Sequence, residues 1–133
     1  MIKTLGTVLP GVLTALLVAP SLAAEHQSGR KVQQYVYVPT LTPRMQEASA
    51  WTDTENCVIG RHFARLAKAT DAGQVILAGR TTEALDKTFR LVIFEAENQE
   101  AARHFMETDP AVEADIMSDT RYPYSVALYR KLR

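Results

Sequence analysis

The stretch RHFARLAKATDAGQVILAGR, residues 61–80, contains the end of a helix, a stop signal and a strand. The helical part continues an apolar stripe at helical spacing, formed by Ile59, Phe63, Leu66, Ala67 and Thr70. Asp71-Ala72-Gly73 predicts the helix end, because glycine adopts the left-handed conformation after a helix without strain. The run Val75–Ala78 is short and rich in β-branched residues, so it predicts a buried strand.

The start of the same helix is marked by Thr52 and Glu55, which stand three residues apart as in a capping box. Cys57 lies on this helix and is the only cysteine of the chain. An internal disulfide is therefore impossible, so the thiol is either buried or available for an intermolecular bridge, and the part-apolar surroundings favour a buried thiol.

The first 23 residues differ from the rest and have the pattern of a secretory signal peptide. Lys3 provides the positive end, residues 5–19 are mostly apolar, and Ser21-Leu22-Ala23 provides small residues for cleavage. The apolar run is shorter than the ~20 residues of a membrane span, and it contains Pro10. We therefore expect a periplasmic or secreted protein that has no membrane attachment after cleavage.

The remaining chain divides into a loose N-terminus, residues 24–31, and one domain, residues 32–133. Without Lys3 it carries 14 basic and 15 acidic side chains. A nucleic-acid-binding protein usually presents a basic surface, so this balance argues against nucleic acid as a partner.

The other predicted elements complete one simple order. Alternation predicts strands over residues 31–38, ended by Pro39, and over residues 122–129, and the apolar run 89–94 predicts a strand that forms a hairpin with 75–78. Asn98 is the N-cap of a second helix, and Asp109 with Pro110 opens a short third one. The order β-α-β-β-α-β is the ferredoxin-like arrangement of the α+β class.

Two of these strands, 89–94 and 122–129, are apolar on both faces, whereas helices on one side can cover only one face of the sheet. A second copy of the chain is the simplest cover for the other face, so we expect a homodimer.

Several short motifs resemble the YciI-like (YCII-related) domain over about residues 32–131. They are His62-Phe63-Ala64-Arg65-Leu66, Asp71-Ala72-Gly73, Leu77-Ala78-Gly79, Phe94-Glu95-Ala96-Glu97 and Asp109-Pro110-Ala111-Val112. The resemblance implies a dimeric α-β barrel of ferredoxin-like protomers. It also implies a pocket between sheet and helices, with His62 and Asp109 as its polar residues.

The chain departs from that family at three positions. Arg80 stands where relatives often have proline, Ala111 where they often have an aromatic residue, and Asp115 near a turn that glycine usually closes. These departures concern the pocket lining, so the reaction of a relative transfers poorly to this chain.

His62 is the first candidate catalytic residue, since a partly buried histidine beside a carboxylate can act as a general base. The alternative is a structural histidine that bonds a backbone carbonyl. Asp109 could orient His62 or handle a proton itself. Its alternative role is that of helix N-cap, and both roles would compete for one carboxylate.

Three further residues are candidates for substrate binding. Arg80, at a strand end, could bind an anionic group, or could simply reach water. Tyr35 and Tyr37, with the tyrosines of the last strand, could line a pocket for an aromatic ligand or form a dimer interface. No pair among the histidines, Cys57 and Asp109 has metal-ligand spacing, and no phosphate-binding glycine loop occurs, so neither metal nor cofactor is predicted.

The sequence therefore predicts an exported small-molecule enzyme of lyase or isomerase type that uses His62 with Asp109 for proton transfer. The alternative is a non-catalytic dimeric module of the cell envelope, either a binder of small hydrophobic ligands or a structural protein. A carboxylate within hydrogen-bond reach of His62 at a cavity favours the first hypothesis, and a mostly apolar cavity without that pair favours the second.

Overall fold

The structure, a computed structural model, describes residues 32–130. The predicted signal peptide and the N-terminus up to residue 31 lie outside this range. The elements in chain order are β1 (Gln33–Leu41), α1 (Asp53–Asp71), β2 (Val75–Arg80), β3 (Arg90–Ala96), α2 (Gln99–Glu107), α3 (Pro110–Glu113) and β4 (Met117–Tyr124). Short 3-10 turns occur at Pro43–Gln46, Ala48–Ala50 and Leu85–Lys87.

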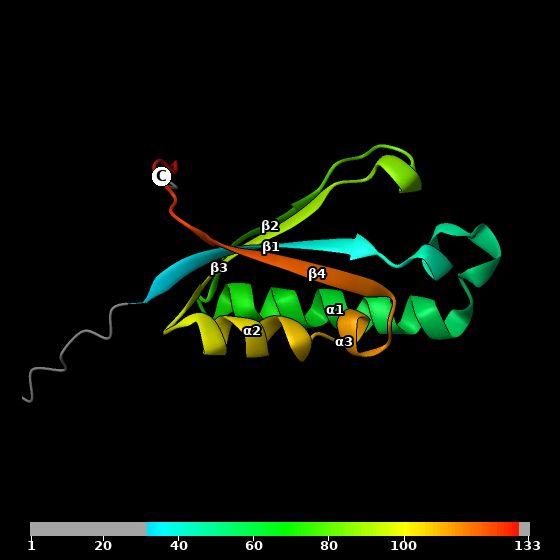
Figure 1. The fold of residues 1–133 in the computed structure, drawn as a ribbon, viewed down its shortest axis with the longest axis horizontal. Helices are drawn as coiled ribbons and strands as arrows, with labels where there is room; N and C mark the ends of the chain where they lie inside the picture. The colour runs from blue at the N-terminus through cyan, green and yellow to red at the C-terminus, as the bar shows by residue number, and fades with distance from the viewer. Residues whose placement is uncertain (1–31, 131–133) are drawn as a thin grey trace, which may run out of the picture.

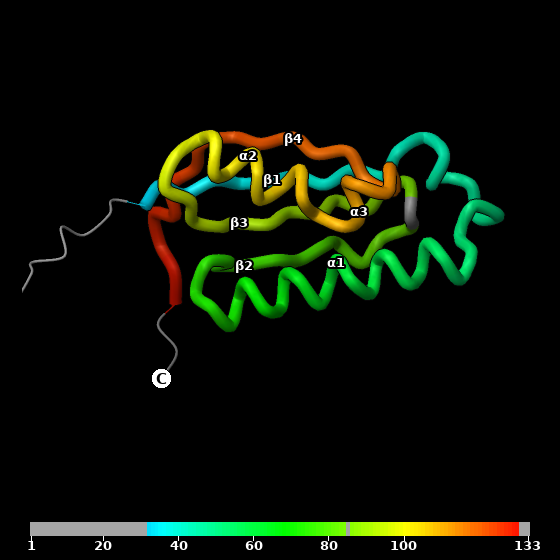
Figure 2. The backbone as a smooth tube through the Cα atoms, turned by 90° about the horizontal axis from the view of Figure 1, so that it is seen from below, coloured from blue at the N-terminus to red at the C-terminus, as the bar shows by residue number. Residues whose placement is uncertain are grey.

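The four strands form one antiparallel sheet in the order β2-β3-β1-β4. All three α-helices lie on one side of it (Figure 1), with α2 and α3 against β1 and β3 and α1 alongside β2 (Figure 2). This order and layering are those of a ferredoxin-like α+β domain, as the sequence predicted. The predicted hairpin between the second and third strands is confirmed by the pairing of β2 with β3.

Both end signals of α1 are confirmed. Thr52 is its N-cap, and a capping box joins Thr52 and Glu55. Hydrogen bonds from Thr52 and then from Arg44 hold the pKa of the Glu55 carboxyl down at about 2. At the other end, Gly73 has a φ of 77°, the left-handed conformation expected of the residue after a helix.

The buried face of α1 is shifted by one residue from the predicted stripe. Val58, Leu66 and Ala69 are buried, whereas Phe63 is exposed. The buried face follows helical spacing through Val58, His62, Leu66 and Ala69. The polar His62 therefore lies on the inner face, where the apolar pattern predicted Phe63. The prediction of a buried Cys57 was also wrong, because Cys57 lies about 100° around the helix from Val58 and its thiol is exposed.

The bounds of two strands differ from the prediction. β1 does not end at Pro39 but continues to Leu41, paired with β4. The pairing of β1 with β3 ends at Tyr37. Pro39, which has no backbone N–H, therefore loses no hydrogen bond to β3. The last strand is Met117–Tyr124 and not 122–129, because β1 begins at Gln33 and offers no partner beyond the pair Gln34–Tyr124.

The strand β2 is also less buried than the run Val75–Ala78 suggested. Only Val75 is buried, because β2 lies at the edge of the sheet. Its inner face looks toward α1 across a cavity, which is described below. Apart from Val75, the side chains on the inner face of β2 therefore line this cavity and do not pack in the core.

The core lies between the sheet and the helices and contains residues of the sheet, α1 and α2, namely Tyr35, Tyr37, Leu66, Val75, Val92, Phe94, Phe105 and Met106. A smaller apolar cluster, which includes Met45, Val58 and Ile116, lies where α1, α3 and the start of β4 meet. Side chains alternate along the strands, so the opposite face of the sheet carries Val36, Ile93, Leu77 and Tyr122. No helix of the described range covers that face (Figure 1).

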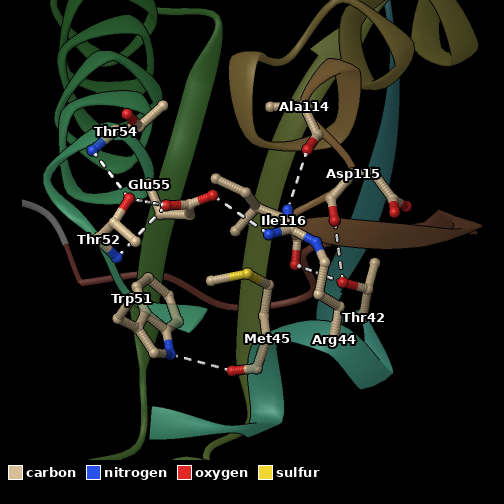
Figure 3. A network of polar contacts seen from close by, with 10 residues as sticks. All are labelled: Thr42, Arg44, Met45, Trp51, Thr52, Thr54, Glu55, Ala114, Asp115 and Ile116. Carbon is tan, nitrogen blue, oxygen red and sulfur yellow. Dashed lines mark hydrogen bonds and ion pairs between the residues drawn. The ribbon is translucent and has the colours of Figure 1, made fainter. Parts of the chain in front are cut away.

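The segment between β1 and α1 is tied to the turn that follows α3 (Figure 3). The Thr42 hydroxyl donates to the carbonyl of Asp115 at 2.9 Å, and Arg44 forms an ion pair with Glu55 at 3.2 Å. The indole N–H of Trp51 donates to the carbonyl of Met45 at 3.0 Å. These bonds fix the first turn of α1 and Trp51, and Trp51 lines the cavity.

Candidate functional site

His62 and Asp109 come together although they are 47 positions apart in the chain. Nδ1 of His62 lies 2.8 Å from Oδ1 and 2.9 Å from Oδ2 of Asp109. The Asp109 carboxyl is completely buried and the His62 side chain is 13% exposed. The helix rotation described above produces this contact, because it turns His62 toward α3 instead of toward solvent.

Asp109 makes both of the contacts that seemed to compete. It is the N-cap of α3, and its Oδ1 accepts a hydrogen bond from the backbone N–H of Ala111 at 2.9 Å. A carboxylate offers about four lone-pair sites, so the same group also binds His62. The cap therefore fixes the carboxylate in place for the histidine.

Arg65, which stands in the same sequence motif as His62 but was not predicted as a site residue, is a third member of this cluster. Its Nη1 lies 3.5 Å from Oδ2 of Asp109, and its Nη2 donates to the carbonyl of Phe105 and to the hydroxyl of Thr108. The guanidinium lies over the Phe105 ring at 4.4 Å from its centre. The signal was its spacing, since residues three apart lie on one helix face, as His62 and Arg65 do.

A cavity of about 680 Å³ lies between α1 and the inner face of β2 and β3. Its volume falls in the range of small-molecule sites. His62, Phe63 and Leu66 line it from α1, and Ala78, Arg80 and Arg90 line it from the sheet. His62 therefore borders the cavity, while its Nδ1 is held by Asp109.

The second ring nitrogen of His62, Nε2, makes no hydrogen bond to any residue that the structure describes. A carboxylate on one nitrogen fixes the ring orientation and favours the tautomer with its proton on Nδ1. In that tautomer Nε2 carries a lone pair. The pair is thus built like a general base with its orienting group.

Of the predicted binding residues, only Arg80 lies at this cavity. Tyr35 and Tyr37 are fully buried on the inner face of β1, within the core, and do not line it. The Tyr35 hydroxyl donates to Oε1 of Gln33 at 2.8 Å. Neither tyrosine reaches the uncovered face of the sheet, so a dimer interface there would not use them.

The Tyr37 hydroxyl is buried and has no hydrogen-bond partner among the described residues. Burial first, then the Asp109 carboxylate, raises the pKa of this phenol far above its usual range. A phenol whose folded-state pKa is raised makes the fold less stable as the pH rises above ~10, because the unfolded chain then ionises before the folded one. Tyr37 therefore stays neutral beside the His62–Asp109 pair.

Tyr37→Phe is expected to leave the free energy of unfolding unchanged or to raise it by up to about 2 kcal/mol, because it removes a buried group that has no partner. It should also reduce the loss of stability above pH ~10. Urea unfolding at neutral and alkaline pH measures both effects. Tyr35→Phe is the matched control and should destabilise by about 1 kcal/mol, since its hydroxyl is bonded. A larger loss in Tyr37→Phe than in the control would contradict this account.

The described residues contain no group of three or more His, Cys, Asp or Glu side chains arranged to hold a metal. His104 lies exposed on α2, away from His62. In the same range no helix is long and apolar enough to cross a bilayer.

The fold and site are those of a ferredoxin-like α+β protomer with a buried histidine–aspartate pair beside a small-molecule-sized cavity. The YCII-related domain model matches residues 37–123. The chain therefore belongs to the YCII-related domain family.

Comparison with solved structures and curated proteins gives two further findings. The chain is similar in structure to 5-chloro-2-hydroxyhydroquinone dehydrochlorinase (TftG) from Burkholderia phenoliruptrix AC1100, in complex with 2,5-dihydroxybenzoquinone. The two share 20% identity over 69% of this chain and 93% of that one, with a TM-score of 0.47. No curated protein matches the chain.

Proposed function

We propose that this protein is a small-molecule enzyme of lyase or isomerase type, in which His62 transfers a proton and Asp109 orients it. The observation that carries the proposal is the 2.8 Å contact between Nδ1 of His62 and the fully buried Asp109 carboxyl, at the edge of a cavity. A binding module has no need of this pair, whereas proton transfer does.

The proposed step begins with a substrate whose acidic C–H group lies against Nε2 of His62. Nε2 takes the proton, and the electron pair of the C–H bond moves toward a neighbouring carbonyl or expels a leaving group from the adjacent carbon. Asp109 stabilises the imidazolium that forms, because a buried anion near it favours the charged ring. Return of the proton to a different atom completes an isomerisation, and its loss to water completes an elimination.

Solvent deuterium exchange tests the proposal without knowledge of the substrate. The protein is incubated in D2O with a panel of α-keto acids, cyclic diketones and hydroxylated aromatic compounds, and loss of C–H signals is followed by NMR. Exchange of at least one compound, absent with heat-denatured protein, is expected. Binding of panel compounds without any exchange would favour the non-catalytic module instead.

We also propose that the protein acts as a homodimer joined through the uncovered face of the sheet. Leu77, Tyr122 and Tyr124 on that face are each about half exposed, and a second sheet would bury them. Sedimentation at micromolar concentration should give twice the protomer mass. Replacement of Tyr122 by lysine should shift this toward the monomer, and a wild-type monomer would contradict the proposal.

Export is the third part of the proposal and follows from the signal-peptide pattern of residues 1–23. The mature protein should begin at Ala24 or Glu25, which intact-mass measurement on an envelope extract would reveal. A soluble cytoplasmic protein that retains Met1 would disprove it.

A further inference from the structure

We propose that the cavity takes a ligand with an anionic end, a carboxylate or phosphoryl group, held by Arg80 and Arg90, and an apolar body that lies against α1. This inference rests on the proposed function, because it names the class of ligand that His62 would meet. Arg90 belongs to none of the family motifs, and only the strand register places it at the site.

The register places the two arginines directly opposite each other. Arg80 is the last residue of β2 and pairs with Arg90, the first residue of β3. Side chains of paired residues lie on the same face of a sheet, and this face also carries Ala78 and Val92. All four residues line the cavity, so both guanidinium groups are at its border.

This arrangement is unfavourable without a ligand, because like charges directly opposite each other on neighbouring strands repel. Burial, and then the charge of Arg80, lowers the pKa of Arg90. Neither arginine forms an ion pair with any residue of the described range. Arg90 donates one hydrogen bond, from Nη1 to the carbonyl of Thr88 at 3.3 Å.

A bound anion resolves this repulsion. Guanidinium groups bind carboxylate and phosphate through pairs of parallel hydrogen bonds, and such charged bonds are about twice as strong as neutral ones. Two adjacent arginines therefore match one carboxylate or phosphoryl group. Each arginine retains free N–H donors for this purpose, since a guanidinium has five.

The rest of the cavity fixes the orientation of the ligand. Phe63 lies on its α1 side and is 71% exposed, so its ring is available for contact with an apolar ligand. Leu66 and Ala67 continue this apolar wall. Asp71 also lines the cavity, but it is the last residue of α1, next to the start of β2, whereas Arg80 ends β2. The anion is thus directed to the arginine end.

Binding of simple probes tests the inference. Benzoate is compared with the neutral benzamide, and phenyl phosphate with phenol, by NMR shifts of the backbone amides of Ala78 and Gly79. The wild-type protein should bind the better of the two anions at least ~10-fold more tightly than its neutral partner. The preference between benzoate and phenyl phosphate then tells which anionic group the site accepts.

Variants connect this preference to the two side chains. Arg80→Gln and Arg90→Gln should each weaken binding of the preferred anion by about 10-fold and leave binding of the neutral partner unchanged. Arg103→Gln on α2, whose arginine pairs with Glu107 outside the cavity, is the matched control and should change neither. Added salt should weaken binding of the anion more than binding of its neutral partner.

Three results would overturn the inference: equal affinity for anion and neutral probe, equal losses in the arginine variants and the control, or no binding of either anion at about 10 mM. The outcome is separable from that for the proposed function. Anion preference without deuterium exchange would contradict only the proposed enzymatic activity. Exchange without anion preference would contradict only the proposed anion site at the two arginines.

Discussion

Replacement of Asp109 by alanine is expected to lower the free energy of unfolding by roughly 2–4 kcal/mol, because it removes a buried carboxylate on which three groups depend. The N-cap bond to Ala111 is lost, and His62 and Arg65 lose their shared anion. Loss of one partner of a completely buried ion pair costs about 3–5 kcal/mol of stability. The full cost is not expected here, because the His62 and Arg65 side chains are 13% and 25% exposed and water can solvate them.

The matched control is Asn98→Ala, which removes the N-cap bond of α2, from Asn98 Oδ1 to the Ala101 N–H at 2.8 Å, without any ionic contact. It should cost about 1 kcal/mol. Urea unfolding of both variants then separates the cap from the ionic contacts. Equal losses would mean that the contacts to His62 and Arg65 contribute nothing to stability.

The local parts of the fold could be predicted because their signals are local. Thr52 with Glu55, Gly73 and Asn98 each act on neighbouring backbone, so a short window of sequence contains the whole argument. The same holds for the cap at Asp109. From such signals the order of elements, and with it the fold class, followed directly.

The strand ends and the helix face depended on distant residues. The alternation over 122–129 is as regular as that of a strand, but the start of β1 at Gln33 decides where the ladder stops. The face of α1 was misplaced because apolar residues were counted, whereas His62 and Arg65 occupy the inner side with Asp109 as partner. A buried face that contains such polar residues cannot be recognised from the spacing of apolar residues alone.

The site was predictable to the same limited extent. Resemblance to relatives pointed to His62 and Asp109, and the strand-end position pointed to Arg80. Arg90 requires the register of β2 on β3, and that register includes an irregularity between Val75 and Leu77. A one-residue slip would move a side chain to the other face, so the sequence alone could not place Arg90 beside Arg80.

His62→Asn is expected to slow proton transfer at least ~100-fold while the fold remains intact, because it removes Nε2 and keeps a group in the place of Nδ1. In the wild type, Nδ1 of His62 lies 2.8 Å from the Asp109 carboxylate. The amide nitrogen of asparagine would take about the position of Nδ1 and could still donate a hydrogen bond to Asp109. Stability should therefore change by less than about 1 kcal/mol. Deuterium exchange of whichever panel compound the wild type accepts measures the rate.

Two further variants show whether the loss comes from the proposed chemistry. His104→Asn changes an exposed histidine on α2 and should leave exchange unaffected. Asp109→Asn keeps an oxygen for the Ala111 N–H but presents an amide to His62, which would then hold its proton on Nε2 and have no lone pair for the substrate. It should slow exchange about as much as His62→Asn while costing less stability than Asp109→Ala. If His62→Asn instead costs several kcal/mol and exchanges at the wild-type rate, the pair is structural, since a base that is removed cannot leave the rate of proton transfer unchanged.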